Sequence, residues 1–245
     1  MAVKPLSGVS RALDVVEAVA AHQPVGVTEL ARLLGQDKSA VQRSLVTLHA
    51  SKWIRPVDDP QGGRVGRWEL STRPLVIAAE SRRRSGLLIH ARPMLQELSE
   101  QTGETVILAV ADDDRIVSVD VVESRRMVRT APRPGMVFPP ATSAAGIALF
   151  AAMPDGEAAR YGVEPDEPSF AAELERTRRR GWSLNAGAVQ AGATSIGAAV
   201  LDVDRRPIAA LVLSAPSDRL GPDQYQRAGE QVAAAAATLG GTAVY

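Results

Sequence analysis

Three polar side chains with complementary hydrogen-bonding geometry, Ser39, Gln42 and Arg43, fall within one short stretch of the chain. The planar guanidinium of Arg43 can donate two parallel hydrogen bonds, and the amide of Gln42 can donate and accept side by side. The hydroxyl of Ser39 suits a phosphate or a single base edge. This set of groups has the chemistry needed to contact nucleobases, with Arg43 fitting guanine and Gln42 fitting adenine.

The stretch that carries these residues is predicted to be a helix. We take Asp37 as its N-cap residue, because aspartate at that position can accept a hydrogen bond from the first turn. Val41, Leu45 and Leu48 then recur at helical spacing and form the buried stripe. The polar residues lie on the opposite face. A face that is simply solvated is the alternative interpretation, and for an isolated helix it is the more frequent one.

The segments around this helix favour the DNA-contacting interpretation. Two shorter helices are predicted before it, over residues 10–21 with Ser10 as N-cap and over residues 28–35 with Thr28 as N-cap. Two short strands, joined by the turn-rich segment "DDPQGG", are predicted after it. This order of elements is that of a winged helix-turn-helix, whose third helix enters the major groove of DNA.

The wing and the start of the third helix add basic residues. Lys38, Arg64 and Arg67 are predicted to attract phosphates without regard to base sequence. The predicted DNA-contacting residues are therefore Thr28, Lys38, Ser39, Ala40, Gln42, Arg43, Arg64 and Arg67.

The distribution of charge agrees with a DNA-binding head. The whole chain of 245 residues has a formal net charge of zero. Residues 1–85 nevertheless hold 13 Lys and Arg against 8 Asp and Glu, while the other 160 residues hold 15 against 20. Such an asymmetry indicates a basic binding module joined to an acidic body, although it is weak evidence without a motif.

Beyond the wing, the sequence predicts an α+β domain. Helical patterns cover residues 74–84 and 87–103, and alternating strand patterns then begin. Extended segments are expected at "TVILAVA", "RIVSVDVVE", "MVRTAP", "WSLNAGAV", "SIGAAVLDV" and "PIAALVLSA", with helices between them and a closing helix near the end. We expect a winged helix-turn-helix over 1–72, a linker helix over 73–86, and an α+β domain on a mostly antiparallel sheet over 87–245.

Catalytic and metal-binding motifs are missing from the sequence. The three histidines share no metal-ligand spacing, and the chain contains no cysteine. A serine–histidine pair is excluded from residues 104–245, which contain no histidine. The acidic run "DDDR" lies between two strand patterns and is best interpreted as a solvated hairpin turn. We expect no catalytic residues, no metal site and no cofactor.

Ordered motifs along nearly the whole chain resemble those of the IclR family of bacterial transcriptional regulators. In chain order they are "SRALDVVEAVA", "TELARLLGQDKSAVQRSLVTL", "ARPMLQELSEQTGETVILAV", "PPATSAAGIALFA", "RRRGWSL" and "IAALVLSAP". No single motif is unique, but the ordered set is specific. The resemblance implies a winged helix-turn-helix, a linker helix used in dimerisation, and a C-terminal effector-binding domain similar to a GAF fold.

The resemblance also implies an effector pocket between the sheet and the helix that follows "TSAAGIA". Small residues there would let backbone amides near a helix start approach an anionic ligand, although close packing of helix on sheet explains them equally well. The residues that match pocket positions of the family are Ser143, Ala144, Ala145, Gly146, Asn185, Ser195, Val212 and Ser214.

At several of these positions the chain departs from the family pattern. Many members carry paired carboxylates where this chain has Gly187 and Ala188, and one of two strand serines is replaced by Val212. The pocket is therefore expected to offer neutral hydrogen-bonding groups. Because a buried charge needs a partner, a neutral or larger, partly apolar effector should fit better than a small oxo-acid. The alternative is a constitutive regulator that has lost effector sensing.

The expected partners follow from the same resemblance. A homodimer, or a dimer of dimers, would bind a near-palindromic operator in double-stranded DNA, since two-fold protein symmetry maps onto half-site symmetry. The other expected partner is a small-molecule effector. No apolar run approaches the roughly 18 residues of a membrane span, and no signal-peptide pattern begins the chain, so we expect a cytoplasmic protein without a membrane partner.

Overall fold

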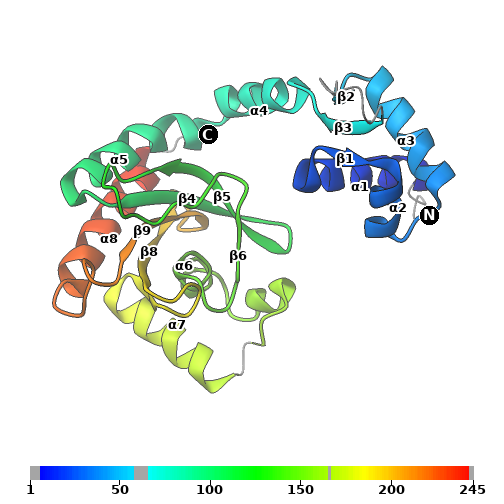
Figure 1. Cartoon of the computed structure of the whole chain (residues 1–245). Coiled ribbons are helices and arrows are strands. Elements are labelled where there is room, and N and C mark those ends of the chain that lie inside the picture. Colours follow the sequence, from blue (N-terminus) through cyan, green and yellow to red (C-terminus); the bar gives the residue numbers. More distant parts are fainter. Residues whose placement is uncertain (1–5, 58–65, 165–166, 243–245) are drawn as a thin grey trace. The chain divides into compact units, whose positions relative to one another are not determined.

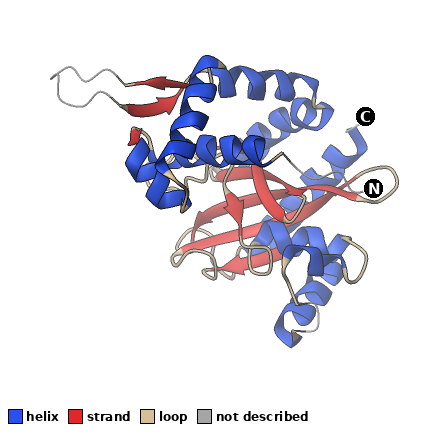
Figure 2. Cartoon of the chain, turned by 90° about the vertical axis from the view of Figure 1, so that its right-hand side faces the viewer, coloured by secondary structure: helices blue, strands red, loops and turns tan. Residues whose placement is uncertain are grey.

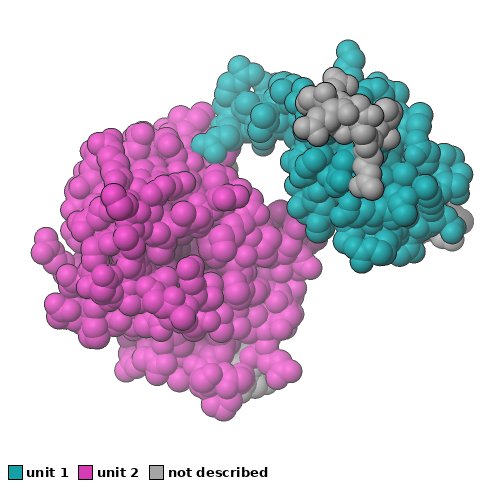
Figure 3. Space-filling model, in the orientation of Figure 1, with its two compact units in different colours: residues 1–84 teal, residues 85–245 magenta. Residues whose placement is uncertain are grey.

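The computed structural model describes residues 6–57, 66–164 and 167–242. The chain divides into two compact units, residues 1–84 and residues 85–245, shown in teal and magenta in Figure 3. Each unit has a hydrophobic core of its own.

The described part of the first unit combines helices with a small antiparallel sheet (Figure 1). Its elements are α1 (Ser7–His22), β1 (Val25–Gly26), α2 (Val27–Leu34), α3 (Lys38–Ala50), β2 (Ile54–Pro56), β3 (Arg67–Leu70) and α4 (Arg73–Arg84). The strand order is β1-β3-β2, so β3 pairs with both of the others. This is the winged helix-turn-helix order that the sequence predicts.

The core of the first unit is formed where α1, α2 and α3 meet the sheet. Val41 and Leu45 of α3 are fully buried and Leu48 is 6% exposed, so the predicted buried stripe of this helix is confirmed. The side chains of Val15 and Val19 provide the buried face of α1. Burial of these aliphatic side chains removes them from water and fixes α3 to the body of the unit.

Two predicted helix starts are wrong. The first helix begins at Ser7 rather than after Ser10, and α2 begins at Val27 rather than after Thr28. The N-cap residue of α2 is Gly26, whose backbone is extended because it pairs with Arg67 of β3. Tertiary pairing of this short strand therefore determines where α2 begins, and a local N-cap preference does not.

The turn between α2 and α3 has the geometry that the glycine indicates. Gly35 follows α2 in the left-handed conformation, with φ of 60°, which costs glycine less than any residue with a Cβ. The N–H of Gln36 donates to the carbonyl of Ala31 at 3.0 Å and closes the end of the helix. The N-cap position of α3 is Asp37, as predicted, but its side chain accepts no hydrogen bond from the first turn.

The second unit is an antiparallel sheet with helices on both faces (Figure 2). Its elements are α5 (Gly86–Thr102), β4 (Thr105–Asp112), β5 (Arg115–Val122), β6 (Val137–Phe138), α6 (Ala144–Ala152), the 3-10 helix η1 (Glu157–Tyr161), α7 (Pro168–Arg180), β7 (Ser183–Ala186), β8 (Ala193–Leu201), β9 (Pro207–Pro216) and α8 (Tyr225–Thr242). The strand order is β6-β5-β4-β9-β8-β7.

Each face of this sheet has its own core. One face packs against α5 and α8, with Leu95 and Leu239 fully buried between helices and strands. The other face packs against α6, η1 and α7, through residues such as Leu149 and Phe170. The predicted α+β class with an antiparallel sheet is confirmed, and the arrangement is a sheet layer between two helical layers.

One predicted strand is wrong. The segment "MVRTAP", residues 127–132, belongs to an irregular connection between β5 and β6, which we name the strap (residues 123–136). Met127 and Val128 are 95% and 66% exposed, so the alternation of apolar residues does not mark a buried strand face here. Pro132 and Pro134 lack the N–H groups that a strand interior requires.

Candidate functional site

The outward face of α3 presents the polar residues on which the DNA-binding prediction depends. Lys38, Ser39, Gln42 and Arg43 are all exposed. Helical spacing places residues 39, 42 and 43 on one side of the helix, opposite Val41 and Leu45, because successive positions turn by about 100°. This face is free of the core and can meet a partner without any loss of packing.

Ala40 was also predicted to contact DNA, and its position on α3 contradicts that prediction. It is 7% exposed and lies with Ser44 on the buried side of α3. The buried face is wider than the predicted stripe, since it includes the positions next to Val41 and Leu45 as well. The methyl group of Ala40 therefore supports helix packing. Thr28, in contrast, is exposed in the first turn of α2.

The wing arginines differ in how far the structure describes them. Arg64 lies outside the described residues. Arg67 is in β3, where its Nε donates to the carbonyl of Pro24 at 2.8 Å and its Nη2 lies 3.5 Å from Glu29 Oε2. These contacts join β3 to the start of α2. The guanidinium of Arg67 thus has intramolecular partners, unlike the simple phosphate contact that was predicted.

The second unit contains a cavity of about 480 Å³ within the size range of small-molecule sites. Seven of the eight predicted effector-binding residues line it, although they come from four separate segments of the chain. They are Ser143, Ala144, Ala145, Asn185, Ser195, Val212 and Ser214. Strands β7, β8 and β9 of the sheet provide four of these lining residues, and the start of α6 provides the other three.

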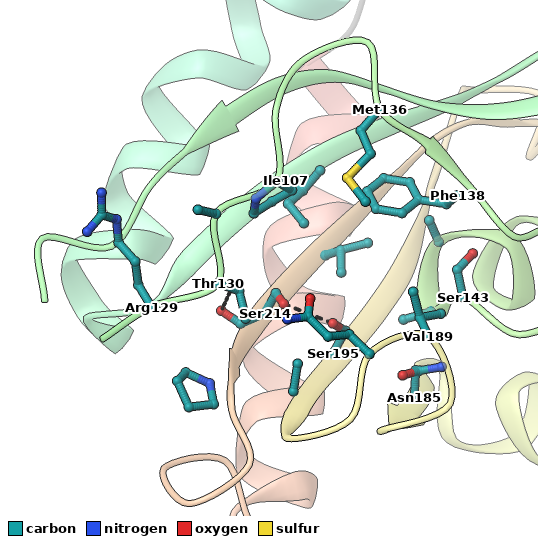
Figure 4. Close-up of a pocket in the computed structure, with 18 of the residues that line it drawn as sticks. Ile107, Arg129, Thr130, Met136, Phe138, Ser143, Asn185, Val189, Ser195 and Ser214 are labelled. Atoms are coloured by element: carbon teal, nitrogen blue, oxygen red, sulfur yellow. Dashed lines mark hydrogen bonds between the residues drawn. The ribbon is translucent and has the colours of Figure 1, made fainter. Parts of the chain in front are cut away.

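Two serines form a hydrogen-bonded pair in the cavity. Ser195 of β8 faces Ser214 of β9 in the antiparallel register, and Ser195 Oγ donates to Ser214 Oγ at 2.9 Å (Figure 4). The carbonyl of Ser214 accepts a second hydrogen bond, at 3.0 Å, from the hydroxyl of Thr130 in the strap. Sheet pairing therefore brings these hydroxyl groups together at a fixed spacing.

The amide of Asn185 and the N-cap of α6 form another part of the wall. Asn185 is 5% exposed, and its Nδ2 donates to the carbonyl of Thr142 at 2.5 Å. Ser143 caps α6, because its Oγ accepts a hydrogen bond of 3.1 Å from the N–H of Gly146. Backbone N–H groups in the first turn of a helix have no acceptor within the helix, so Ala144 and Ala145 bring donor groups to the cavity.

Gly146 was predicted to bind the effector, but it does not line the cavity. A Cβ built at this position would lie 2.0 Å from the carbonyl oxygen of Pro140, so only glycine allows this close approach. A similar contact occurs at Gly197 of β8, whose Cβ would lie 2.7 Å from the carbonyl oxygen of Ala144. Gly197 thus allows close packing of α6 on the sheet, the alternative interpretation, whereas Gly146 packs α6 against the connection that precedes it.

The cavity is mostly apolar and contains little charge. Ile107, Met136 and Phe138 contribute hydrocarbon surface (Figure 4), and Val212 adds to it. Among the described lining residues, Arg129 is the one that carries a formal charge. Its Nε donates to Glu123 Oε2 at 3.0 Å, so a carboxylate already neutralises it.

Sequence reasoning missed two segments of the wall. The strap contributes six lining residues, and the connection before β8 contributes four more, from Val189 to Gly192. Both are irregular segments whose contacts with the cavity depend on the fold of distant strands. The nearest sequence signal was a run of small and turn-forming residues around Gly192, which indicates a loop and nothing about its neighbours.

Within the described ranges, no three His, Cys, Asp or Glu side chains come together in a way that could hold a metal ion. Over the same residues, every helix is too short or too polar to cross a bilayer.

The fold and the site together define a class of protein: a DNA-binding winged helix-turn-helix joined to an α+β unit with a ligand-sized pocket. Two protein-family models match the chain. The model described as "Bacterial transcriptional regulator IclR C-terminal" matches residues 80–240, and the "IclR helix-turn-helix domain" matches residues 8–58. The chain belongs to the IclR family of transcriptional regulators.

Individual relatives agree with this assignment. The chain is 26% identical to the transcriptional repressor IclR of Escherichia coli strain K12, with 94% of this chain and 88% of that protein covered. It is 25% identical to the HTH-type transcriptional repressor AllR of the same strain, over 84% of this chain and 78% of that protein.

Solved structures show the same fold. An IclR transcriptional regulator from Alicyclobacillus acidocaldarius matches with a TM-score of 0.82 and 21% identity, covering 98% of this chain and all of that one. The IclR of Thermotoga maritima matches with a TM-score of 0.73 and 20% identity, covering 95% of this chain and 96% of that one.

Proposed function

We propose that this IclR-family regulator represses transcription from a near-palindromic operator, and that a small molecule bound in the unit 2 pocket changes its affinity for that operator. Exposure of Gln42 and Arg43 on a helix fixed by a buried stripe is the observation that carries the DNA-binding part. Two of the relatives are named as repressors, which supports repression rather than activation. Action on chromosomal DNA would place the protein in the cytoplasm.

For the effector, we propose a neutral or partly apolar small molecule. The described wall combines hydrocarbon surface with the hydroxyl groups of Ser195 and Ser214 and the amide of Asn185. The single charged lining residue, Arg129, is paired with Glu123. A multiply charged ligand would lose hydration without gaining a free opposite charge, which is unfavourable. The presence of a formed cavity argues against the alternative, a constitutive regulator.

We also propose that the functional unit is a homodimer, or a dimer of dimers. Val9 and Leu13 lie one turn apart on α1 and are 56% and 55% exposed, and the N-cap residue Leu6 is 74% exposed. Leu75 and Val76 of α4 are 70% and 66% exposed. Apolar surface of this kind on a soluble unit is typical of an interaction face. Two copies would present two α3 helices to successive half-sites of DNA.

The effector class is tested by a melting-temperature screen of the full-length protein. The compounds should form matched sets of similar size: neutral polar molecules, aromatic or aliphatic monocarboxylates, and small dicarboxylates. We expect the largest shift from a neutral or partly apolar compound. A rise in melting temperature caused only by small dicarboxylates would contradict the proposed effector class. If the protein binds its operator with an affinity that no compound changes, the constitutive alternative is favoured.

The DNA-binding part is tested by footprinting on the promoters that flank the coding region of the protein. We expect protection of two half-sites related by near two-fold symmetry. The affinity for that operator should fall steeply as salt concentration rises, because phosphate contacts release counterions. An affinity that is independent of salt would contradict the phosphate contacts.

A further inference from the structure

A buried ion pair outside the pocket holds the strap in place. The Glu104 carboxylate, at the start of β4, is 8% exposed. Arg219, which follows β9, donates to both of its oxygens: Nε to Oε1 at 2.7 Å and Nη2 to Oε2 at 2.7 Å. The same Nη2 also donates to the carbonyl of Val128, in the strap, at 2.9 Å. One guanidinium therefore links the sheet to the strap.

The geometry of this link requires arginine. A planar guanidinium can donate to two carboxylate oxygens in parallel while another N–H donates elsewhere, whereas an ammonium group is a single point of donation. Hydrogen bonding with Glu104 raises the pKa of Arg219 above its already high ordinary value, so the side chain stays charged. Arg126, itself a strap residue, adds a second cation with its Nε 3.7 Å from Glu104 Oε1.

A second set of hydrogen bonds fixes the strap closer to the cavity. Thr105, the neighbour of Glu104, is fully buried and donates from its Oγ1 to the carbonyl of Thr130 at 2.8 Å. The same Oγ1 accepts from the N–H of Ser124 at 3.1 Å. The hydroxyl of Thr130 in turn donates to the carbonyl of Ser214 in the pocket wall. Side-chain hydrogen bonds thus hold the strap at Val128 and Thr130, and Ser124 adds another from its Oγ to the carbonyl of Gly103 at 2.6 Å.

The position of the strap matters because it forms one wall of the cavity. Val128 and Thr130, which accept hydrogen bonds from Arg219 and Thr105, are both lining residues. The strap has no strand pairing over residues 123–136 to hold it, apart from backbone contacts near Ser118. Its distance from the sheet therefore depends on these side-chain anchors.

We propose that Glu104 and Arg219 are positioning residues of the effector pocket: their ion pair holds the strap against the sheet and so sets the shape of the cavity. Neither residue lines the cavity. The inference rests on the proposed function only in treating the cavity as the effector site. The anchoring itself is a property of the chain and can be measured without effector or DNA.

The chain offers a clean reporter because it contains no cysteine. Val212 lines the cavity and is 3% exposed, so Val212→Cys places a single thiol of similar size behind the strap. The rate at which dithiobis(nitrobenzoate) modifies this thiol in the full-length protein measures how often the wall opens. Repeating the measurement at several urea concentrations below the unfolding transition separates local opening from global unfolding.

The test variant is Arg219→Lys and its matched control is Arg180→Lys, each made in the reporter protein. Arg180 is paired with Glu173 at 2.6 Å, and its side chain is 23% exposed against 22% for Arg219. Its pair lies on α7 and has no contact with the strap among the described hydrogen bonds. We expect Arg219→Lys to raise the modification rate about ten-fold, as the loss of hydrogen bonds to a charged group would, with little dependence on urea.

The control should stay within about two-fold of the parent rate, because its pair does not anchor the wall. Equal rates for Arg219→Lys and Arg180→Lys would overturn the proposal, as would an acceleration that follows global unfolding. If Arg219→Lys does not fold, Glu104→Gln becomes the test variant and Glu173→Gln its control. Their modification rates are compared by the same criteria. Operator binding is measured in a separate experiment. A negative result for the positioning role therefore leaves the proposed regulator function untouched, and loss of operator binding would not contradict the positioning role.

Discussion

Ser195 and Ser214 face each other across the antiparallel strands β8 and β9, and the Oγ of Ser195 donates a 2.9 Å hydrogen bond to the Oγ of Ser214. The pair lies in the cavity, at the point where the strap is joined to the sheet through Thr130 and the Ser214 carbonyl. A ligand hydroxyl or carbonyl group could exchange hydrogen bonds with either serine. This relationship leads to the first prediction.

Ser214→Ala should weaken binding of the effector that the melting screen identifies by about five-fold, the effect of losing one hydrogen bond of roughly 1 kcal/mol. Ser217→Ala is the matched control. Ser217, directly after β9, has its Oγ 3.0 Å from Oγ1 of Thr194 in β8, and neither residue lines the cavity. Isothermal titration of both variants checks the prediction. An equal loss in the two variants would show that the effect comes from the strands rather than from the pocket.

Val212→Ser should move the ligand preference toward small oxo-acids. By the family resemblance, sensors of small acids carry a serine where this chain has Val212, and the substitution adds a hydroxyl to a wall that is apolar there. We expect pyruvate to raise the melting temperature of the variant more than that of the parent, while the effector of the parent loses affinity. A response to pyruvate that is the same in both proteins would contradict the role of Val212 in selectivity.

Arg43→Ala and Lys38→Ala should weaken operator binding in different ways. Arg43→Ala is expected to cost about 1–3 kcal/mol and to relax the preference for one base position, because a guanidinium reads a guanine edge. Lys38→Ala should weaken binding to all sequences alike and reduce the salt slope by about one unit. Binding to a set of singly substituted operators at several salt concentrations distinguishes them. Identical behaviour would mean that the predicted register of α3 on DNA is wrong.

Leu45→Ala should destabilise the first unit by about 2–5 kcal/mol, because it leaves a cavity in the core where the side chain is fully buried. The neighbouring substitution Val46→Ala is the control. Val46 is 56% exposed, and surface changes of this kind shift stability by no more than about 0.5 kcal/mol. Urea unfolding followed by the fluorescence of Trp53 and Trp68 gives both values. Similar losses would contradict the assignment of the buried face.

The first unit shows how much local sequence can determine. The repeat of Val41, Leu45 and Leu48 predicted both the helix and its buried face, because helical spacing alone places these residues on one side. Gly35 marked the turn before it for an equally local reason, its tolerance of a positive φ. Burial of Ala40 was missed because the width of the buried face depends on the elements that pack against it.

The walls of the pocket could be predicted only in part from local sequence. Family resemblance indicated several wall residues, but the sequence placed residues 127–132 in a strand, and the structure places them in the strap. The difference arises because the strap is held by Thr105 and Arg219, which are separated from it by 25 and 91 positions along the chain. Periodicity cannot report such contacts.

The sequence by itself determined the order of the helices and wing strands in the first unit, the buried face of α3 and the membership of the IclR family, because each depends on residue type and spacing along the chain. Only the tertiary structure decided which segments enclose the cavity, that Gly146 serves packing, and that Glu104 and Arg219 meet beside the strap. The cavity and the ion pair depend on antiparallel pairing, such as that between β4 and β9, which brings together residues that are far apart in sequence.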